Sequence, residues 1–310
     1  MTTFLKLLCD ELKSLGKDGV ELKTADGESI LYHVYGPLWS VDSGAKPKLA
    51  RHRAHNGKCP CGYCTHPSIP VPGYALNQLR LVERDANKHV VRCTERTHRS
   101  VLADMLKADV LDRAGKLKPS KDGSTQDHVN GVLGISPLAG VPKFDLVYGY
   151  VIDYLHTLLL GILFAMLNYI FENKEAASEI PTIDKRLSGI CPPHTMAAQK
   201  RLLSEISDWK GKELRLFGLY FVLPCFQGLR KIPARRYEQV RKFVVILQIV
   251  LSSYITEDQL QLAERLVNEF VSDFQDLFGA IHMTLNPHLL KHIIKIVRAW
   301  GPVSCYSILF

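Results

Sequence analysis

Apolar residues recur with helical or alternating spacing along much of the chain. From Thr2 to Leu15 they have helical spacing, and Gly16 is expected to end that helix. Val20–Leu22 and Ile30–Val41 instead have the pattern of two strands. Asp26-Gly27 between them predicts a hairpin, because the central positions of such a turn need positive φ.

The second half of the chain has a predominantly helical pattern. The expected helices are Ser100–Arg113, Tyr154–Glu172, Ala197–Trp209, Glu213–Phe221, Arg236–Tyr254, Glu257–Phe278 and Pro287–Trp300, with a short strand over Phe144–Ile152. The apolar run from Thr157 to Phe171 is short for a membrane span and suits a buried helix, so we expect no membrane partner.

Composition and charge are those of an ordinary globular protein. The 310 residues are 46% hydrophobic and 23% charged, and the net charge of +8 permits a polyanionic partner without requiring one. Of eight cysteines only Cys59, Cys61 and Cys64 cluster, and charge interrupts the N-terminus at Lys6. We therefore expect an intracellular protein with reduced thiols.

Cys61-Gly62-Tyr63-Cys64 has the spacing of a zinc knuckle, in which two thiolates on a tight turn hold one edge of a tetrahedral ion. Two more ligands are needed, and His66, His89, Cys93 and His98 follow closely in sequence. The alternative is a set of free core cysteines. A thioredoxin-type redox pair is disfavoured, because prolines rather than a βαβ pattern follow the motif.

The segment from Ser43 to Lys58 contains no acidic residue and carries the strongest basic run of the chain. Its cations are Lys46, Lys48, Arg51, Arg53 and Lys58. Such a run is typical of a solvated loop, but it can also neutralise phosphates of a nucleic acid.

Carboxylates and histidines elsewhere suggest further chemistry. Asp42 follows an apolar strand, where an Asp commonly starts a turn but can also bind magnesium. Asp153 and His156 share one helical face, as do His288 and His292. For both pairs the simplest interpretation is mutual or backbone hydrogen bonding; the histidine pair is also a possible metal-binding face.

An ordered series of short motifs resembles the transposases of En/Spm-type (CACTA) cut-and-paste DNA transposons. The motifs are Phe4–Leu15 with Asp18-Gly19-Val20, the strand ending in Asp42, Asn56-Gly57, Cys61-x-x-Cys64-x-His66-Pro67, Gly134–Leu138, Phe144–Tyr150, Asp153–Gly161, Asp184–Leu187, Leu219–Pro224, Met283–His292 and Trp300–Phe310. Each motif is weak alone, but together they cover nearly the whole chain in the family's order.

The resemblance implies an α+β, helix-rich fold with a partial RNase H-like catalytic core, a zinc knuckle and a large all-α insertion. It implies a core over 1–58 and 135–153, a knuckle and loop region over 59–134, the insertion over 154–280 and a C-terminal core helix over 281–310. In that family three acidic residues hold divalent metal for strand cleavage and transfer. Asp42 matches the second acid, Asp153 and His156 match a signature near the active site, and His98 matches a recurring histidine.

We therefore expect a nuclear or intracellular transposase-derived protein. Its partners would be transposon-end DNA and a second copy in a homo-oligomer, and its metals structural Zn²⁺ at Cys61, Cys64, His66 and His98 and catalytic Mg²⁺ or Mn²⁺. The first catalytic acid would precede the initial helix and the last would follow Phe310, so we expect the chain alone to be inactive as a nuclease. The alternatives are a domesticated zinc-containing DNA- or protein-binding module without catalysis, and a poorly stable relic.

Overall fold

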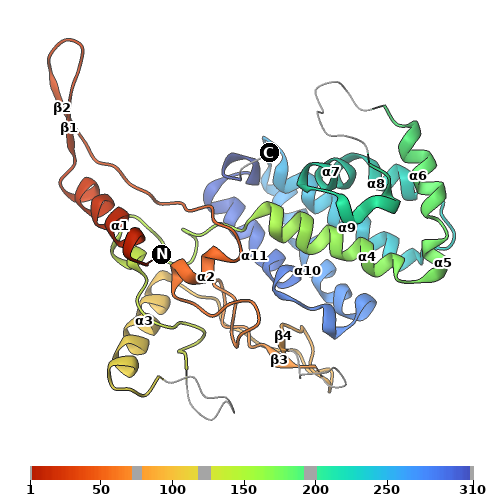
Figure 1. Cartoon of the computed structure of the whole chain (residues 1–310), viewed down its shortest axis with the longest axis horizontal. Helices are drawn as coiled ribbons and strands as arrows, with labels where there is room; N and C mark the ends of the chain where they lie inside the picture. The colour runs from red at the N-terminus through yellow and green to blue at the C-terminus, as the bar shows by residue number, and fades with distance from the viewer. Residues whose placement is uncertain (1, 72–78, 118–126, 192–200, 308–310) are drawn as a thin grey trace. The chain divides into compact units, whose positions relative to one another are not determined.

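A computed structural model describes residues 2–71, 79–117, 127–191 and 201–307 (Figure 1). The chain divides into two units, Met1–Val151 and Ile152–Phe310. Among the described residues, strands form only two antiparallel sheets of two strands each, and helices dominate. The helix-rich α+β class is therefore confirmed, whereas the RNase H-like core and its insertion stay predictions.

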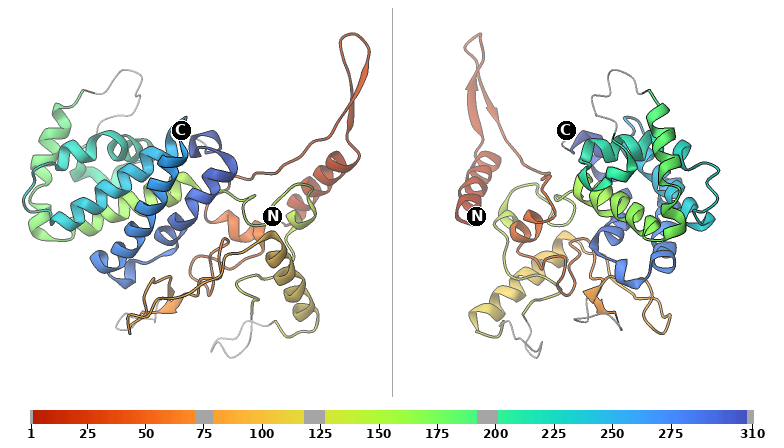
Figure 2. Two further views of the ribbon diagram at one scale, coloured as in Figure 1. Left: turned by 180° about the vertical axis from the view of Figure 1, so that it is seen from behind. Right: turned by 45° about the vertical axis from the view of Figure 1, so that its right-hand side comes forward.

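Unit 1 begins with a helix and a hairpin. Helix α1 spans Thr2–Lys17, β1 spans Val20–Lys23 and β2 spans Ser29–Tyr32. The predicted hairpin is present and Gly27 has a φ of 83° in its turn, but Asp26 lacks the positive φ that the Asp-Gly signal predicts for both central positions. The two strands extend away from α1 as a ribbon, which is visible from two further directions (Figure 2).

The predicted strand over Ile30–Val41 is wrong in its length, because regular pairing ends at Tyr32. Past that residue a single parallel bridge remains, between Trp39 and Tyr150. The Trp39 N–H donates to the Gly149 carbonyl at 2.7 Å. Beyond Tyr32, the predicted strand Ile30–Val41 therefore forms only this bridge among the described residues. The predicted strand Phe144–Ile152 is likewise wrong, because this bridge at Tyr150 is its only strand pairing there.

The remaining elements of unit 1 are short apart from one helix. They are α2 (Ala45–Ala50), β3 (Ile69–Pro70), β4 (Leu79–Arg80), α3 (His98–Arg113) and the 3-10 turn η1 (Pro137–Gly140). The predicted helix over Ser100–Arg113 is confirmed by α3. The basic segment has a composition typical of a solvated loop, but α2 occupies part of it. Residues 118–126, which follow α3, lie outside the described residues.

Unit 2 is almost entirely helical. Its elements are η2 (Tyr154–Phe164), α4 (Ala165–Phe171), α5 (Lys174–Ala177), α6 (Ile180–Gly189), η3 (Leu203–Asp208), α7 (Gly211–Leu216), η4 (Phe217–Phe221), α8 (Val222–Phe226), α9 (Ala234–Leu251), α10 (Glu257–Phe278), η5 (Ala280–His282), α11 (Leu285–Trp300) and η6 (Val303–Cys305). The predicted helix from Ala197 is wrong within the described residues, which hold only the 3-10 helix η3; residues 192–200 lie outside them.

The core of unit 2 is built on helices α9 and α10, which pack side by side. The rings of Phe243 and Phe270 lie 5.5 Å apart across this interface. The buried Gln239 amide donates to the Phe270 carbonyl at 2.6 Å, so its polar group is satisfied. The Lys242 ammonium lies 2.8 Å from the Asp273 carboxylate at the edge of the same interface.

Helices η2 and α4 form one apolar stretch over residues 154–171. By length and composition this stretch could cross a membrane, but a core helix of a soluble protein passes the same test, and half of it is buried. The first eleven residues are a π-helix that begins after Asp153. A side chain at Gly161 would collide with Asn286 of α11, so the glycine allows these two helices to approach closely.

Candidate metal centre

The two thiols of the Cys-x-x-Cys turn face one another inside unit 1. Cys61 and Cys64 are fully buried, and their sulfur atoms lie within 4.8 Å of each other. The backbone N–H of Tyr63 donates to the Cys61 sulfur at 3.4 Å. Zinc–sulfur bonds of about 2.3 Å require a sulfur–sulfur edge of about 3.8 Å in a tetrahedral site. The turn therefore supplies one edge of such a site.

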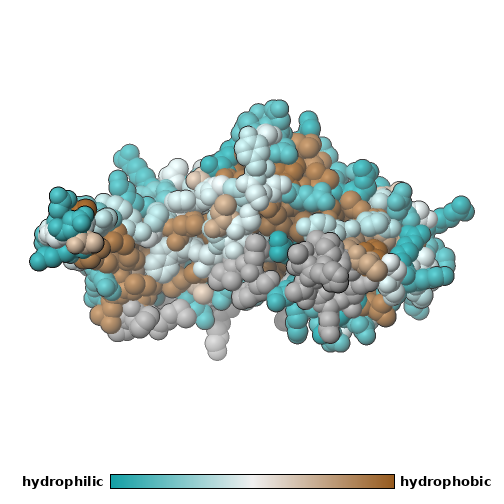
Figure 3. All heavy atoms as spheres, turned by 90° about the horizontal axis from the view of Figure 1, so that it is seen from above, coloured by the Kyte–Doolittle hydropathy of each residue, from teal (hydrophilic) through white to brown (hydrophobic). Residues whose placement is uncertain are grey.

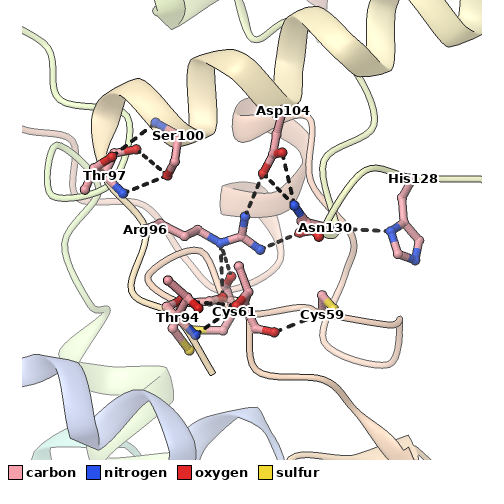
Figure 4. A network of polar contacts seen from close by, with 12 residues as sticks. Cys59, Cys61, Thr94, Arg96, Thr97, Ser100, Asp104, His128 and Asn130 are labelled. Atoms are coloured by element: carbon pink, nitrogen blue, oxygen red, sulfur yellow. Dashed lines mark hydrogen bonds and ion pairs between the residues drawn. The ribbon is translucent and has the colours of Figure 1, made fainter. Parts of the chain in front are cut away.

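Arg96 forms hydrogen bonds with the backbone of this turn (Figure 4). Its buried guanidinium donates through Nε to the carbonyls of Cys61 and Cys64 at 3.1 and 3.0 Å. The Nη2 atom donates to the Asn130 carbonyl, and Asp104 lies 3.5 Å from Nη1. The Asn130 amide in turn donates to Asp104 at 3.1 Å. One buried cation thus orders the backbone on both sides of the two thiols.

A short backbone pairing ties the turn to helix α3. Cys64 forms an antiparallel bridge with Glu95, and Thr65 donates to the Thr94 carbonyl at 2.8 Å. Two residues after Glu95, Thr97 caps α3 by accepting from the Ser100 N–H at 3.1 Å. The knuckle is therefore anchored to a regular helix rather than held in an unsupported loop.

Without metal the Cys64 thiol is held protonated. A hydrogen bond with Cys61 and then burial raise the pKa of Cys64. Burial likewise raises the pKa of Cys59. Thiolates are the form that binds zinc, so metal binding at this turn must release thiol protons.

The structure does not bring the predicted ligands His66 and His98 together with the thiols. His66 is buried and its Nδ1 donates to the Pro67 carbonyl at 2.9 Å. His98 begins α3, and its Nδ1 accepts from the Leu146 N–H at 3.2 Å. Within the described part of unit 1, no third His, Cys, Asp or Glu joins Cys61 and Cys64 in a group with all ligand atoms within 4.8 Å.

A buried imidazole pair occurs in unit 2. His288 and His292 lie one turn apart on α11, and both are buried. Their Nε2 atoms are 3.4 Å apart. Zinc–nitrogen bonds of 2.0–2.1 Å give a tetrahedral edge of about 3.3 Å, which this separation matches. The i, i+4 spacing of these histidines is visible in the sequence. The sequence does not show that both rings are buried or that their Nε2 atoms face each other.

The four side chains are thus two buried pairs of zinc-type ligands, thiols in unit 1 and imidazoles in unit 2. Each pair supplies two zinc-type ligand atoms, and each can hold zinc only with further ligands. The two pairs support the general prediction that the protein binds structural zinc. Magnesium or manganese at Asp42 has no such support.

Lys46 is not placed as a surface cation. Its ammonium donates to the Tyr63 hydroxyl at 2.6 Å and lies 3.9 Å from the centre of that ring. Burial lowers the pKa of Lys46 to about 7, although the nearby Cys61 acts in the opposite direction. The Lys46 amine therefore stabilises the knuckle turn through its contact with the Tyr63 side chain.

The other predicted phosphate-binding residues lie near the surface. Lys48, Arg51 and Lys58 are exposed, and Arg53 is half-buried and paired with Asp127. Lys48, Arg51 and Arg53 line a concave surface of about 500 Å³ that has no acidic lining residue. This part of unit 1 can therefore receive an anion.

Asp42 is exposed and forms a turn before α2. Its Oδ1 accepts from the N–H groups of Gly44 and Ala45 at 2.8 and 2.6 Å. This is the turn-starting role that an Asp at this position commonly has. It leaves the second oxygen, Oδ2, as the atom available to a metal ion.

Asp153 and His156 pair with each other in unit 2. Asp153 caps η2 by accepting from the His156 N–H at 3.2 Å, and its second oxygen lies 2.5 Å from the His156 Nδ1. The pair is the mutual one that their spacing predicts. Its role in catalysis stays a prediction.

No family model, no curated protein and no solved structure matches the chain.

Proposed function

We propose that this chain is a transposase-derived, zinc-containing protein that binds DNA through the basic surface of unit 1. The observation that carries this proposal is the concave surface lined by Lys48, Arg51 and Arg53 without an acidic residue. Phosphates attract such cations and release counterions on binding. The ordered resemblance to CACTA transposases supplies the class of nucleic acid, transposon-end DNA.

Zinc is proposed as a structural element of this protein. Both buried pairs, Cys61 with Cys64 and His288 with His292, are proposed as zinc ligands. The imidazole nitrogens have the 3.4 Å separation of a tetrahedral edge, the two sulfur atoms lie within 4.8 Å of each other, and neither pair can complete a coordination shell by itself. Support for the thiol pair comes from Arg96, which fixes the carbonyls of both cysteines. Bound zinc would then stabilise the fold by its binding free energy.

Catalysis by this chain alone is not part of the proposal. Two-metal phosphodiester chemistry needs several carboxylates that clamp two ions about 3.5–4 Å apart. Asp42 is the one residue of this chain that matches a member of the family's acidic triad, and one of its oxygens caps a turn. We therefore propose a DNA-binding derivative of an RNase H-like transposase, with an incomplete magnesium or manganese site.

Fluorescence anisotropy with a labelled DNA duplex over a series of salt concentrations tests the DNA-binding proposal. We expect the full chain to bind with an affinity that falls as salt rises. Substituting Lys48, Arg51 and Lys58 together by Gln should lower the slope of log affinity against log salt by about three, since each lost phosphate contact removes about 0.9.

The control removes the same charge from another exposed surface of unit 1. Arg99, Lys107 and Lys116 are exposed on or just after α3, and the triple Gln variant changes the net charge equally. Its salt slope should stay close to that of the unchanged protein. Equal weakening in both triple variants would contradict a specific basic surface, as would binding that does not respond to salt.

A further inference from the structure

The β1–β2 ribbon exposes an apolar face. In its register Val20 lies opposite Tyr32 and Leu22 lies opposite Ile30, and the side chains of such cross-strand pairs share one face. Leu22, Ile30 and Tyr32 are 52%, 39% and 46% exposed. Apolar side chains also reach the surface at the left-hand end of Figure 3, the end that carries the ribbon. Two-stranded ribbons are marginally stable by themselves, so this face favours a partner.

The outer edge of β1 is open among the described residues. The Thr24 N–H donates to the Glu28 carbonyl at 2.8 Å, which makes these two residues a hydrogen-bonded pair. Hydrogen-bonded and non-hydrogen-bonded pairs alternate in an antiparallel ladder. Glu21 and Lys23 therefore direct their backbone N–H and carbonyl groups outward, where a further strand can bind them.

Self-pairing of this edge has one register that the charges favour. When two copies of β1 pair antiparallel about a two-fold axis at Leu22, Glu21 of each copy lies opposite Lys23 of the other. The two other registers that use the same outward groups place Glu21 opposite Glu21 or Lys23 opposite Lys23, which is destabilising. Neither side chain forms an ion pair among the described residues.

We propose that β1 is a dimerisation strand, which pairs with β1 of a second copy and joins two ribbons into a four-stranded sheet. The contact is isologous, since the same residues serve on both copies. The outer edge of β2 would instead pair Ser29 with Leu31, which has no charge complementarity. This proposal does not depend on DNA binding or on zinc.

Sedimentation velocity of the full chain over a range of concentrations tests the dimer. We expect a monomer–dimer equilibrium in the unchanged protein. Glu21→Lys and Lys23→Glu should each raise the dissociation constant about tenfold or more, because each places like charges opposite one another twice per dimer. The double variant Glu21→Lys/Lys23→Glu should restore the original dissociation constant.

The two single variants change the net charge in opposite directions, so a shared effect cannot come from net charge. Glu28→Lys in the hairpin turn makes the same charge change as Glu21→Lys outside the pairing edge, and it should leave the dimer unchanged. All substituted positions are exposed, and circular dichroism checks that each variant folds. A chain that stays monomeric, single variants without effect, or a double variant that fails to restore the dimer would each overturn the proposal.

Discussion

At the scale of single residues, Arg96 has the largest structural role in the candidate metal centre. It is 2% exposed, yet it is a full cation with hydrogen bonds to three backbone carbonyls and an ion pair with Asp104. A planar guanidinium with a fixed fork of donors can reach all these acceptors at once, and a lysine ammonium cannot. The sequence alone gave no signal for this role, because Arg96 is one of many basic residues.

We predict that Arg96→Lys destabilises the chain by about 2–3 kcal/mol, because buried carbonyls lose their donor while the charge remains buried. Urea unfolding of the zinc-loaded protein measures the change. Arg99→Lys is the matched control: Arg99 is exposed at the start of α3, and its replacement should change stability by less than about 0.5 kcal/mol. Equal stability of the two variants would contradict the assigned role.

At the scale of elements, helices with clear start signals were predicted best. The bounds of α10 agree with the prediction over Glu257–Phe278, because Thr256 marks its start. The short helix α2 was missed, since Pro47 and a run of cations disguise it. The strand over Ile30–Val41 was overestimated, because an apolar pattern does not show whether a partner strand exists; pairing ends at Tyr32.

The capping box of α10 supports an element-scale prediction. Thr256 Oγ1 accepts from the Gln259 N–H at 3.3 Å, and the Gln259 side chain accepts from the Thr256 N–H at 2.9 Å. Thr256→Ala should cost about 1 kcal/mol of unfolding free energy, whereas Thr256→Ser keeps the oxygen and should cost a few tenths. Chemical denaturation compares the two. An alanine variant as stable as the serine variant would argue against this cap.

At the scale of the whole molecule, the sequence indicated helix richness, the zinc-type cysteine turn and the histidine pair. It named His66 and His98 as the remaining ligands because they are near the cysteines in sequence, and the structure places both rings in other hydrogen bonds. The spacing of two ligands in a sequence does not give the direction or burial of their side chains. The facing, buried Nε2 atoms of His288 and His292 are such a case.

Zinc content and coordination of the full chain test the central claim most directly. Elemental analysis with X-ray absorption should find bound zinc with both sulfur and nitrogen neighbours, since the buried pairs are thiols and imidazoles. Cys61→Ser/Cys64→Ser should remove the sulfur neighbours and His288→Gln/His292→Gln should lower the number of nitrogen neighbours, whereas Cys305→Ser at an exposed cysteine should change neither. A folded chain without zinc, or sulfur neighbours retained by the Cys61→Ser/Cys64→Ser variant, would contradict the account.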